Sequence, residues 1–306
     1  MTVFDALFQQ LIVLKRHLDQ AAVPFILGGG MGLWLRDTFM TGQRSPRYER
    51  VLPSRSTEDL DLLLSAEVII DPTQMKDLRD ILKSLGFTAV VNYMQFEHEL
   101  TVGGHRQTVK VDLLASPPHE DRLNDVKITA FRIRPKQTKK IHAYLTREAA
   151  GIHISPITLD VSSGLQSTAP AEVQIPSSLN YLVLKLHAFK DRHDISDTNP
   201  DGGRHHALDI FRIVTDMRQS DWKSAQHHTS TEKEMEYLQV AAYLQRRFFS
   251  NVSALGAVRI RENQSYQNER ATFDTYLPLV LNDLDELFSD VENPAEDVFA
   301  RWGLRQ

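Results

Sequence analysis

Two carboxylates that stand two residues apart at the start of a short apolar run are the first groups in this chain that suggest chemistry. Asp59 and Asp61 open the run, which continues to Leu64. A short, bounded apolar run predicts a largely buried strand, along which both carboxylates point the same way, roughly 7 Å apart. Such a pair repels and loses hydration, and an oxygen-preferring cation such as Mg²⁺ or Mn²⁺ relieves both costs. The competing interpretation is two ordinary acids at a solvated strand start.

A third aspartate stands inside a second apolar strand. The stretch from Thr108 to Leu114 alternates, so that Val109 and Val111 share one face while Asp112 lies on the other. A lone acid in such a run is costly unless it has a partner. A position beside the first two carboxylates would supply that partner. The glycines just before this stretch, at 103 and 104, predict a hairpin with the strand that precedes them.

A glycine-rich turn comes earlier in the chain. Residues 23–27 predict a short strand, which runs into Gly28, Gly29 and Gly30, and a helical pattern follows. Glycines let the backbone approach a ligand, and N–H groups at a helix start favour an anion. The turn therefore predicts a phosphate-binding segment, with close packing of strand and helix as the alternative. It is not a P-loop, because no Gly-Lys-Ser/Thr follows.

Composition limits the class of protein. The chain has 306 residues, of which 42% are hydrophobic and 25% charged, as in soluble proteins of one or two domains. It contains no cysteine, so disulfides, zinc–thiolate sites and cysteine nucleophiles are excluded. It shows no apolar run long enough for a membrane span and no signal peptide, so we expect a cytoplasmic protein. The net charge of −5 argues against a broadly basic surface for nucleic acid.

The pattern of elements divides the chain near residue 175. Strand-like and helical segments alternate before this point, and amphipathic helices dominate after it. We therefore predict an α+β fold. Its N-terminal domain, 1–175, is a mixed β-sheet flanked by helices, and its C-terminal domain, 176–306, is helical. Residues 38–55 predict an arginine-rich loop that either holds phosphates or is simply solvated. The polar stretch around His227 and His228 predicts a linker.

Two groups of polar residues stand in the predicted helical domain. Lys185 lies in the middle of the apolar run of a helix predicted over 178–192. His205 and His206 open the next helix, and Asp209 follows three residues after His206, so that these two share a face. Histidines and a carboxylate in this arrangement are able to bind a metal ion, although a histidine pair at a helix start is more often solvated.

Taken together, the glycine turn, the two spaced aspartates and the later aspartate resemble the DNA polymerase β-like nucleotidyltransferase superfamily. Within it, the chain is most similar to the AbiEii/AbiGii-type nucleotidyltransferases, over roughly residues 20–215. The matching residues are Gly29-Gly30, Arg55-Ser56-Thr57-Glu58-Asp59-Leu60-Asp61, Val111-Asp112, Leu184-Lys185 and Ala207-Leu208-Asp209-Ile210.

The resemblance implies an enzyme that moves a nucleoside monophosphate from an NTP to a hydroxyl group of RNA, a protein or a small molecule. It implies that Asp59, Asp61 and Asp112 are catalytic and bind Mg²⁺ or Mn²⁺. The residues that it implies for nucleotide binding are Gly28, Gly29, Gly30, Arg55, Ser56, Lys185 and Asp209. Several members of the group are toxins of bacterial toxin–antitoxin or abortive-infection systems, which makes an antitoxin a candidate partner.

Two other functions compete with this one. The first is a catalytically silent nucleotide-binding or interaction module of the same fold, which the presence of all three acids disfavours. The second is a metal-dependent hydrolase built on His205, His206 and Asp209.

The sequence also departs from the family at the first turn of the predicted phosphate-binding helix. Met31 stands where the family often has serine or threonine, so backbone N–H groups would have to replace that hydroxyl contact.

Overall fold

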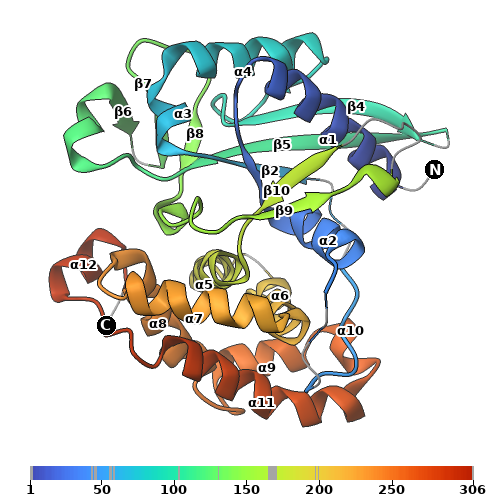
Figure 1. Cartoon of the computed structure of the whole chain (residues 1–306), viewed down its shortest axis with the longest axis vertical. Coiled ribbons are helices and arrows are strands. Elements are labelled where there is room, and N and C mark those ends of the chain that lie inside the picture. The colour runs from blue at the N-terminus through green and yellow to red at the C-terminus, as the bar shows by residue number, and fades with distance from the viewer. Residues whose placement is uncertain are drawn as a thin grey trace. The chain divides into compact units, whose positions relative to one another are not determined.

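The protein has an α+β fold with two compact units. The structure is a computed structural model that describes residues 3–42, 44, 47–54, 57, 59–102, 104–129, 131–164, 171–196, 198 and 200–304. Figure 1 labels the elements along the chain. The first unit comprises Met1–Met40 and Ser54–Pro176, and the second comprises Thr41–Pro53 and Ser177–Gln306.

A mixed β-sheet forms the centre of the first unit. Within the described residues its strands follow the order β1-β2-β5-β8-β7-β6, with β4 paired to β5 and β3 paired to β4. The β2–β5 and β5–β8 pairs are parallel and the others are antiparallel. The strands are β1 (Ile26–Leu27), β2 (Asp59–Leu64), β3 (Thr88–Ala89), β4 (Gln95–Val102), β5 (His105–Ala115), β6 (Val126–Thr129), β7 (Arg132–Pro135) and β8 (Ala143–Leu145), and β9 (Ile157–Asp160) pairs separately with β10 (Glu172–Ile175).

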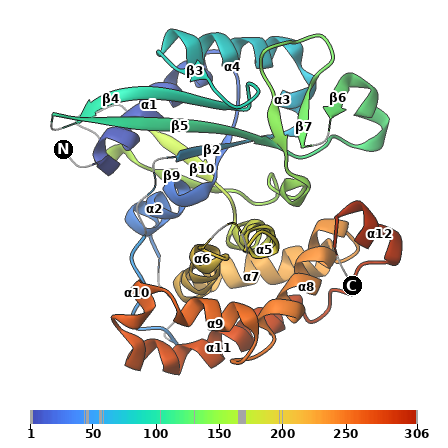
Figure 2. The same cartoon turned by 180° about the vertical axis from the view of Figure 1, so that it is seen from behind.

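Helices pack against this sheet. They are α1 (Val3–Gln20), α2 (Gly29–Phe39), α3 (Ala66–Ile70) and α4 (Pro72–Ser84), with short 3₁₀ turns at Glu120–Asp125, Arg147–Ala149 and Ser162–Gly164. The α1 helix buries Leu7, Leu11 and Leu14 on one stripe, as its amphipathic pattern requires. At the start of α4, the side chain of Asp71 accepts a hydrogen bond from Thr73 N at 2.7 Å. Phe8 of α1 packs against Trp34 and Phe39 of α2 with ring centroids 5.8 Å apart in each pair, and Figures 1 and 2 show α1 and α4 packed alongside the sheet.

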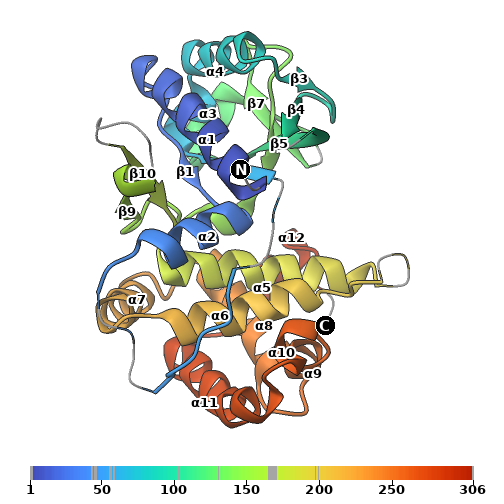
Figure 3. The same cartoon turned by 90° about the vertical axis from the view of Figure 1, so that its right-hand side faces the viewer.

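The second unit is helical apart from the segment at 41–53. Its helices are α5 (Ser178–Asp194), α6 (Arg204–Asp216), α7 (Gln219–Thr231), α8 (Glu236–Phe249), α9 (Leu255–Arg261), α10 (Gln264–Gln267), α11 (Arg270–Phe288) and α12 (Glu296–Arg301). Figure 3 shows α5 running beside α6. The prediction of a linker around His227 and His228 is wrong, because both residues lie in α7. His228 is buried there, with its Nε2 2.7 Å from the hydroxyl oxygen of Tyr237. No helix in the described part of the chain is long and apolar enough to cross a membrane.

The segment Thr41–Pro53 belongs to the second unit, whereas the predicted boundary placed it in the first domain. Tyr48 is buried, and its hydroxyl donates a hydrogen bond to Asp283 at 2.6 Å. Arg47 forms an ion pair with the same carboxylate, and Arg212 Nε donates to the carbonyl of Leu52 at 3.2 Å. The arginine-rich segment is therefore held by structural contacts with residues from the C-terminal half of the chain.

A buried histidine makes the second unit sensitive to acid. His187 packs against Trp302 with ring centroids 5.1 Å apart, and burial lowers its pKa from 6.5 to about 3. The unfolded chain takes up this proton below pH 6.5, but the folded chain does not until about pH 3. Acid therefore favours unfolding, and stability is lost as the pH falls through this window.

We expect the free energy of unfolding to decrease by about 2 kcal/mol as the pH falls from 6.5 to 5, through His187 alone. The substitution His187→Phe keeps a ring against Trp302 and should abolish this part of the pH dependence, as measured by urea denaturation at both values. The matched change at an exposed position of α7, His227→Phe, should leave the dependence intact. Equal pH dependence in wild type and His187→Phe would contradict the assignment.

Candidate functional site

The β2 strand presents Asp59 and Asp61 on one face. Leu60 and Leu62 are fully buried on the other face, and both aspartates are half-buried. The strand alternates as the sequence predicts, because its leucines pack into the core of the first unit while the carboxylates remain at the edge of that core. The local sequence therefore sets the direction of both acidic side chains.

The parallel pairing of β2 with β5 brings the third aspartate beside the first two. Asp61 stands directly opposite Asp112, and Asp59 stands opposite Lys110. Side chains that are opposite each other in neighbouring strands share a face, and the strands lie about 4.8 Å apart. The three aspartates therefore lie on one face of the sheet, in two adjacent rows.

The environment of Asp112 disfavours its negative charge. Burial raises the pKa of this carboxyl above its ordinary value, and the neighbouring charge of Asp59 raises it further. A hydrogen bond from Gln95 Nε2 to Asp112 Oδ1, 2.8 Å long, opposes these effects. A half-buried carboxylate beside another carboxylate is stabilised either by a proton or by a cation, so the site favours positive charge at this position.

The glycine turn packs directly against Asp61. The backbone N–H of Gly28 donates to the carbonyl of Asp61 at 2.8 Å. Gly29 has a φ of +60°, and a Cβ atom built on it would lie 1.7 Å from Asp61 Oδ2. A Cβ on Gly30 would lie 2.9 Å from the Cβ of Thr57. Neither position has room for a side chain, so two of the glycines are required by the close approach of the turn to the acidic strand.

The α2 helix begins in this turn, with Gly28 as its N-cap and no side-chain cap. The first N–H groups of a helix have no acceptor within the helix, and the N-terminal end attracts negative charge. Met31 is fully buried, so its side chain points into the core and offers no contact to a ligand. Any anion held here would be bound by backbone N–H groups, as the sequence predicts.

The predicted nucleotide-binding residues of the C-terminal half meet each other in the second unit. Lys185 Nζ donates to Asp209 Oδ2 at 2.7 Å, and Arg212 Nη1 donates to Asp209 Oδ1 at 3.2 Å. All three side chains are buried. The structure therefore joins Lys185 and Asp209 in a buried ion-pair network between α5 and α6. Arg55 and Ser56 lie outside the described residues.

In the alternative histidine site, Asp209 is already paired with Lys185 and Arg212. His205 Nε2 lies 3.4 Å from Asp201 Oδ1. In the ranges that the structure describes, no group of three or more histidine, cysteine, aspartate or glutamate residues is arranged to hold a metal ion. This holds for the histidines of α6 and for the three aspartates of the sheet. Mg²⁺ commonly uses only one or two protein carboxylates and completes its shell with water and substrate phosphates. The all-oxygen donor set of Asp61 and Asp112 fits that mode.

The sequence reasoning missed the neighbours of the acidic rows. Gln95 bonds to Asp112, and Lys110 stands opposite Asp59. The hairpin itself contained the signal for Gln95. Its strands pair from Val102 opposite His105, and counting back from that two-residue turn brings Gln95 opposite Asp112. The position of Lys110 followed from the β2–β5 register, which no local pattern reveals.

No family model matches this sequence, and no curated protein is significantly similar to it. A functional assignment therefore depends on the chemistry of the residues themselves. The first unit offers a carboxylate face, a helix start that attracts anions and a close contact between the two. This combination is suited to binding a phosphate-bearing substrate together with a divalent cation.

Proposed function

We propose that the protein is a metal-dependent nucleotidyltransferase, which moves a nucleoside monophosphate from an NTP to a hydroxyl group of an acceptor. The observation that carries the proposal is the register of β2 and β5, which sets Asp61 opposite Asp112. The contact of Gly29 with Asp61 adds a helix start beside the carboxylates. Carboxylates alone would repel a triphosphate, so the helix start and a cation are both needed at such a site.

In this mechanism the acceptor oxygen attacks the α-phosphorus, and the bond from that phosphorus to the pyrophosphate oxygen breaks. Pyrophosphate leaves with the bonding electron pair. Asp61 and Asp112, with Asp59 on the same face, would hold Mg²⁺ or Mn²⁺, which supplies charge neutralisation at the attacking and leaving oxygens when bound. The raised pKa of Asp112 suits it to accept the proton of the acceptor hydroxyl. The backbone N–H groups of Gly29 and Gly30 would face phosphate oxygens.

The proposal also includes two residues of the second unit, Lys185 and Asp209. The resemblance to the nucleotidyltransferases implies that Lys185 and Asp209 belong to the nucleotide-binding residues, and within the second unit these two side chains are bonded to each other. The same resemblance supports a role as the toxin of a toxin–antitoxin or phage-defence system. RNA, proteins and small molecules remain the acceptor classes under this proposal. The alternative is a catalytically silent nucleotide-binding module of the same fold.

The test is transfer of label from the α-phosphate. The protein is incubated with each α-³²P-labelled NTP and Mg²⁺, in the presence of total RNA, lysate protein or the small-molecule fraction. We expect covalent label in one of the three fractions. EDTA should abolish it, and γ-labelled NTP should give labelled pyrophosphate instead. Binding of an NTP without transfer to any fraction would identify the silent module, and absence of both would exclude a nucleotide site.

A further inference from the structure

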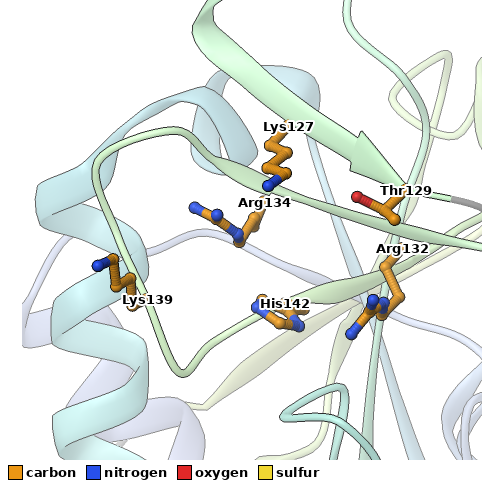
Figure 4. Close-up of a pocket in the computed structure, with 6 residues that line it drawn as sticks. All are labelled: Lys127, Thr129, Arg132, Arg134, Lys139 and His142. Carbon is orange, nitrogen blue, oxygen red and sulfur yellow. The ribbon is translucent and has the colours of Figure 1, made fainter.

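A polar pocket lies at the β6 edge of the same sheet, apart from the strands that carry the aspartates. Its volume is about 250 Å³. The pocket is lined by Lys127, Thr129, Arg132, Arg134, Lys139 and His142, which Figure 4 shows around one hollow. Four of these six residues are lysines or arginines, and none is an acid. The proposed nucleotidyl transfer uses none of them.

The strand register makes the cations converge. Lys127 stands opposite Arg134, and Thr129 stands opposite Arg132 across the β6–β7 pair. These four side chains therefore share one face of the hairpin. His142 comes directly before β8, which is the next strand of the sheet. In Figure 4, Lys127 and Thr129 approach the hollow from one side, and His142 approaches it from the other.

The cationic side chains of this pocket repel one another. Like charges directly opposite each other in neighbouring strands are destabilising, as Lys127 and Arg134 are here. Within the described ranges, neither Lys127, Lys139, Arg132 nor Arg134 has a carboxylate partner. An anion in the hollow would relieve this repulsion.

One of the cations is held rigidly in place. Arg134 Nη1 donates to the carbonyls of Pro135, Lys136 and Thr138 at 2.7, 3.0 and 3.0 Å. Burial lowers the pKa of His142, the backbone of Asn92 opposes this, and Arg132 and Arg134 lower it further. The imidazole is therefore neutral near pH 7 and offers one N–H donor beside the cations. A guanidinium fixed in advance loses less entropy when a ligand binds.

We propose that this pocket binds a compact ligand that carries two or more phosphate groups. Four cations match the charge of a diphosphate. Donors from two strands and from the loop between β7 and β8 surround the hollow, which suits tetrahedral phosphates better than planar carboxylates. A nucleic-acid backbone would call for cations spread along a stripe, whereas these converge on one cavity.

The test is isothermal titration calorimetry with inorganic pyrophosphate, in EDTA, which suppresses any metal-dependent binding at the aspartates. Lys127→Gln and Arg132→Gln should each weaken binding by about tenfold or more. The matched controls Lys136→Gln and Arg106→Gln, at exposed positions outside the pocket lining, should leave the affinity unchanged. Circular dichroism of each variant confirms that the fold is retained.

Two further measurements separate this pocket from the proposed catalytic site. Asp61→Asn should leave pyrophosphate binding unchanged, and loss of binding in that variant would overturn the proposal. A single-stranded oligonucleotide that binds more tightly than pyrophosphate, and is weakened by the same pocket variants, would also overturn it in favour of a nucleic-acid site. Absence of pyrophosphate binding at millimolar concentration would also overturn the proposal. Each outcome is independent of whether nucleotidyl transfer is detected.

Discussion

Asp61→Asn should abolish nucleotidyl transfer, with a fall in rate of about a thousandfold or more. The substitution keeps the shape of the side chain and removes its charge. Asp61 is the residue that both contacts the glycine turn and stands opposite Asp112. Loss of its charge removes a cation ligand and half of the negative pair that a cation would bridge. The initial rate of incorporation of α-labelled nucleotide measures the effect.

The control for this prediction is Asp121→Asn, the same chemical change on an exposed side chain of the first unit. It should retain the wild-type rate. Thermal denaturation should give similar midpoints for both variants and the wild type, because a half-buried asparagine can keep the contacts of the aspartate. Full activity in a folded Asp61→Asn protein would remove Asp61 from the catalytic machinery. It would leave the function of the acidic rows open to the silent-module alternative.

Replacing Asp209 by alanine should cost about 3–5 kcal/mol of the free energy of unfolding. The change leaves the ammonium of Lys185 and the guanidinium of Arg212 buried without their shared carboxylate. Urea denaturation followed by circular dichroism measures the loss. Asp191→Ala, at an exposed position on α5, should change the same quantity by less than about 0.5 kcal/mol.

A double variant tests whether the pair acts as a unit. Lys185→Met combined with Asp209→Leu removes both charges, and should be less destabilised than the sum of the two single variants. Additive losses would show that Lys185 and Asp209 stabilise the unit separately. Nucleotide affinity of the Lys185→Met variant is a separate readout. A loss of affinity beyond that of an equally destabilised variant would support a direct contact between Lys185 and phosphate.

The local patterns of the sequence were enough to predict the strands of the site. The alternation from Asp59 to Leu64 predicted the strand and the common direction of its acids, and β2 has both features. The glycines before β5 predicted its hairpin with β4, and the two strands pair as expected. These features depend on residues that are close in the sequence, so periodicity and turn chemistry determine them.

Long-range features were harder to predict. The pairing of β2 with β5 joins strands separated by two helices and two other strands, so no local signal sets its register. The α7 helix looked like a linker because its sequence is polar, and tertiary contacts such as that of His228 with Tyr237 stabilise it. The β6–β7 hairpin has no local signal either, because the residues between its strands include no glycine or proline.

The ribosome makes Tyr48 long before it makes the carboxylate to which that tyrosine is bonded. The two residues are 235 positions apart, and at about 5–20 residues per second the interval is roughly 10 to 50 s. During this time Leu52 gains its partner Arg212 in α6 first, whereas Tyr48 still lacks its partner in α11. A nascent chain released before Asp283 would leave Tyr48 and Arg47 without their shared carboxylate, so completion of the second unit depends on synthesis reaching α11.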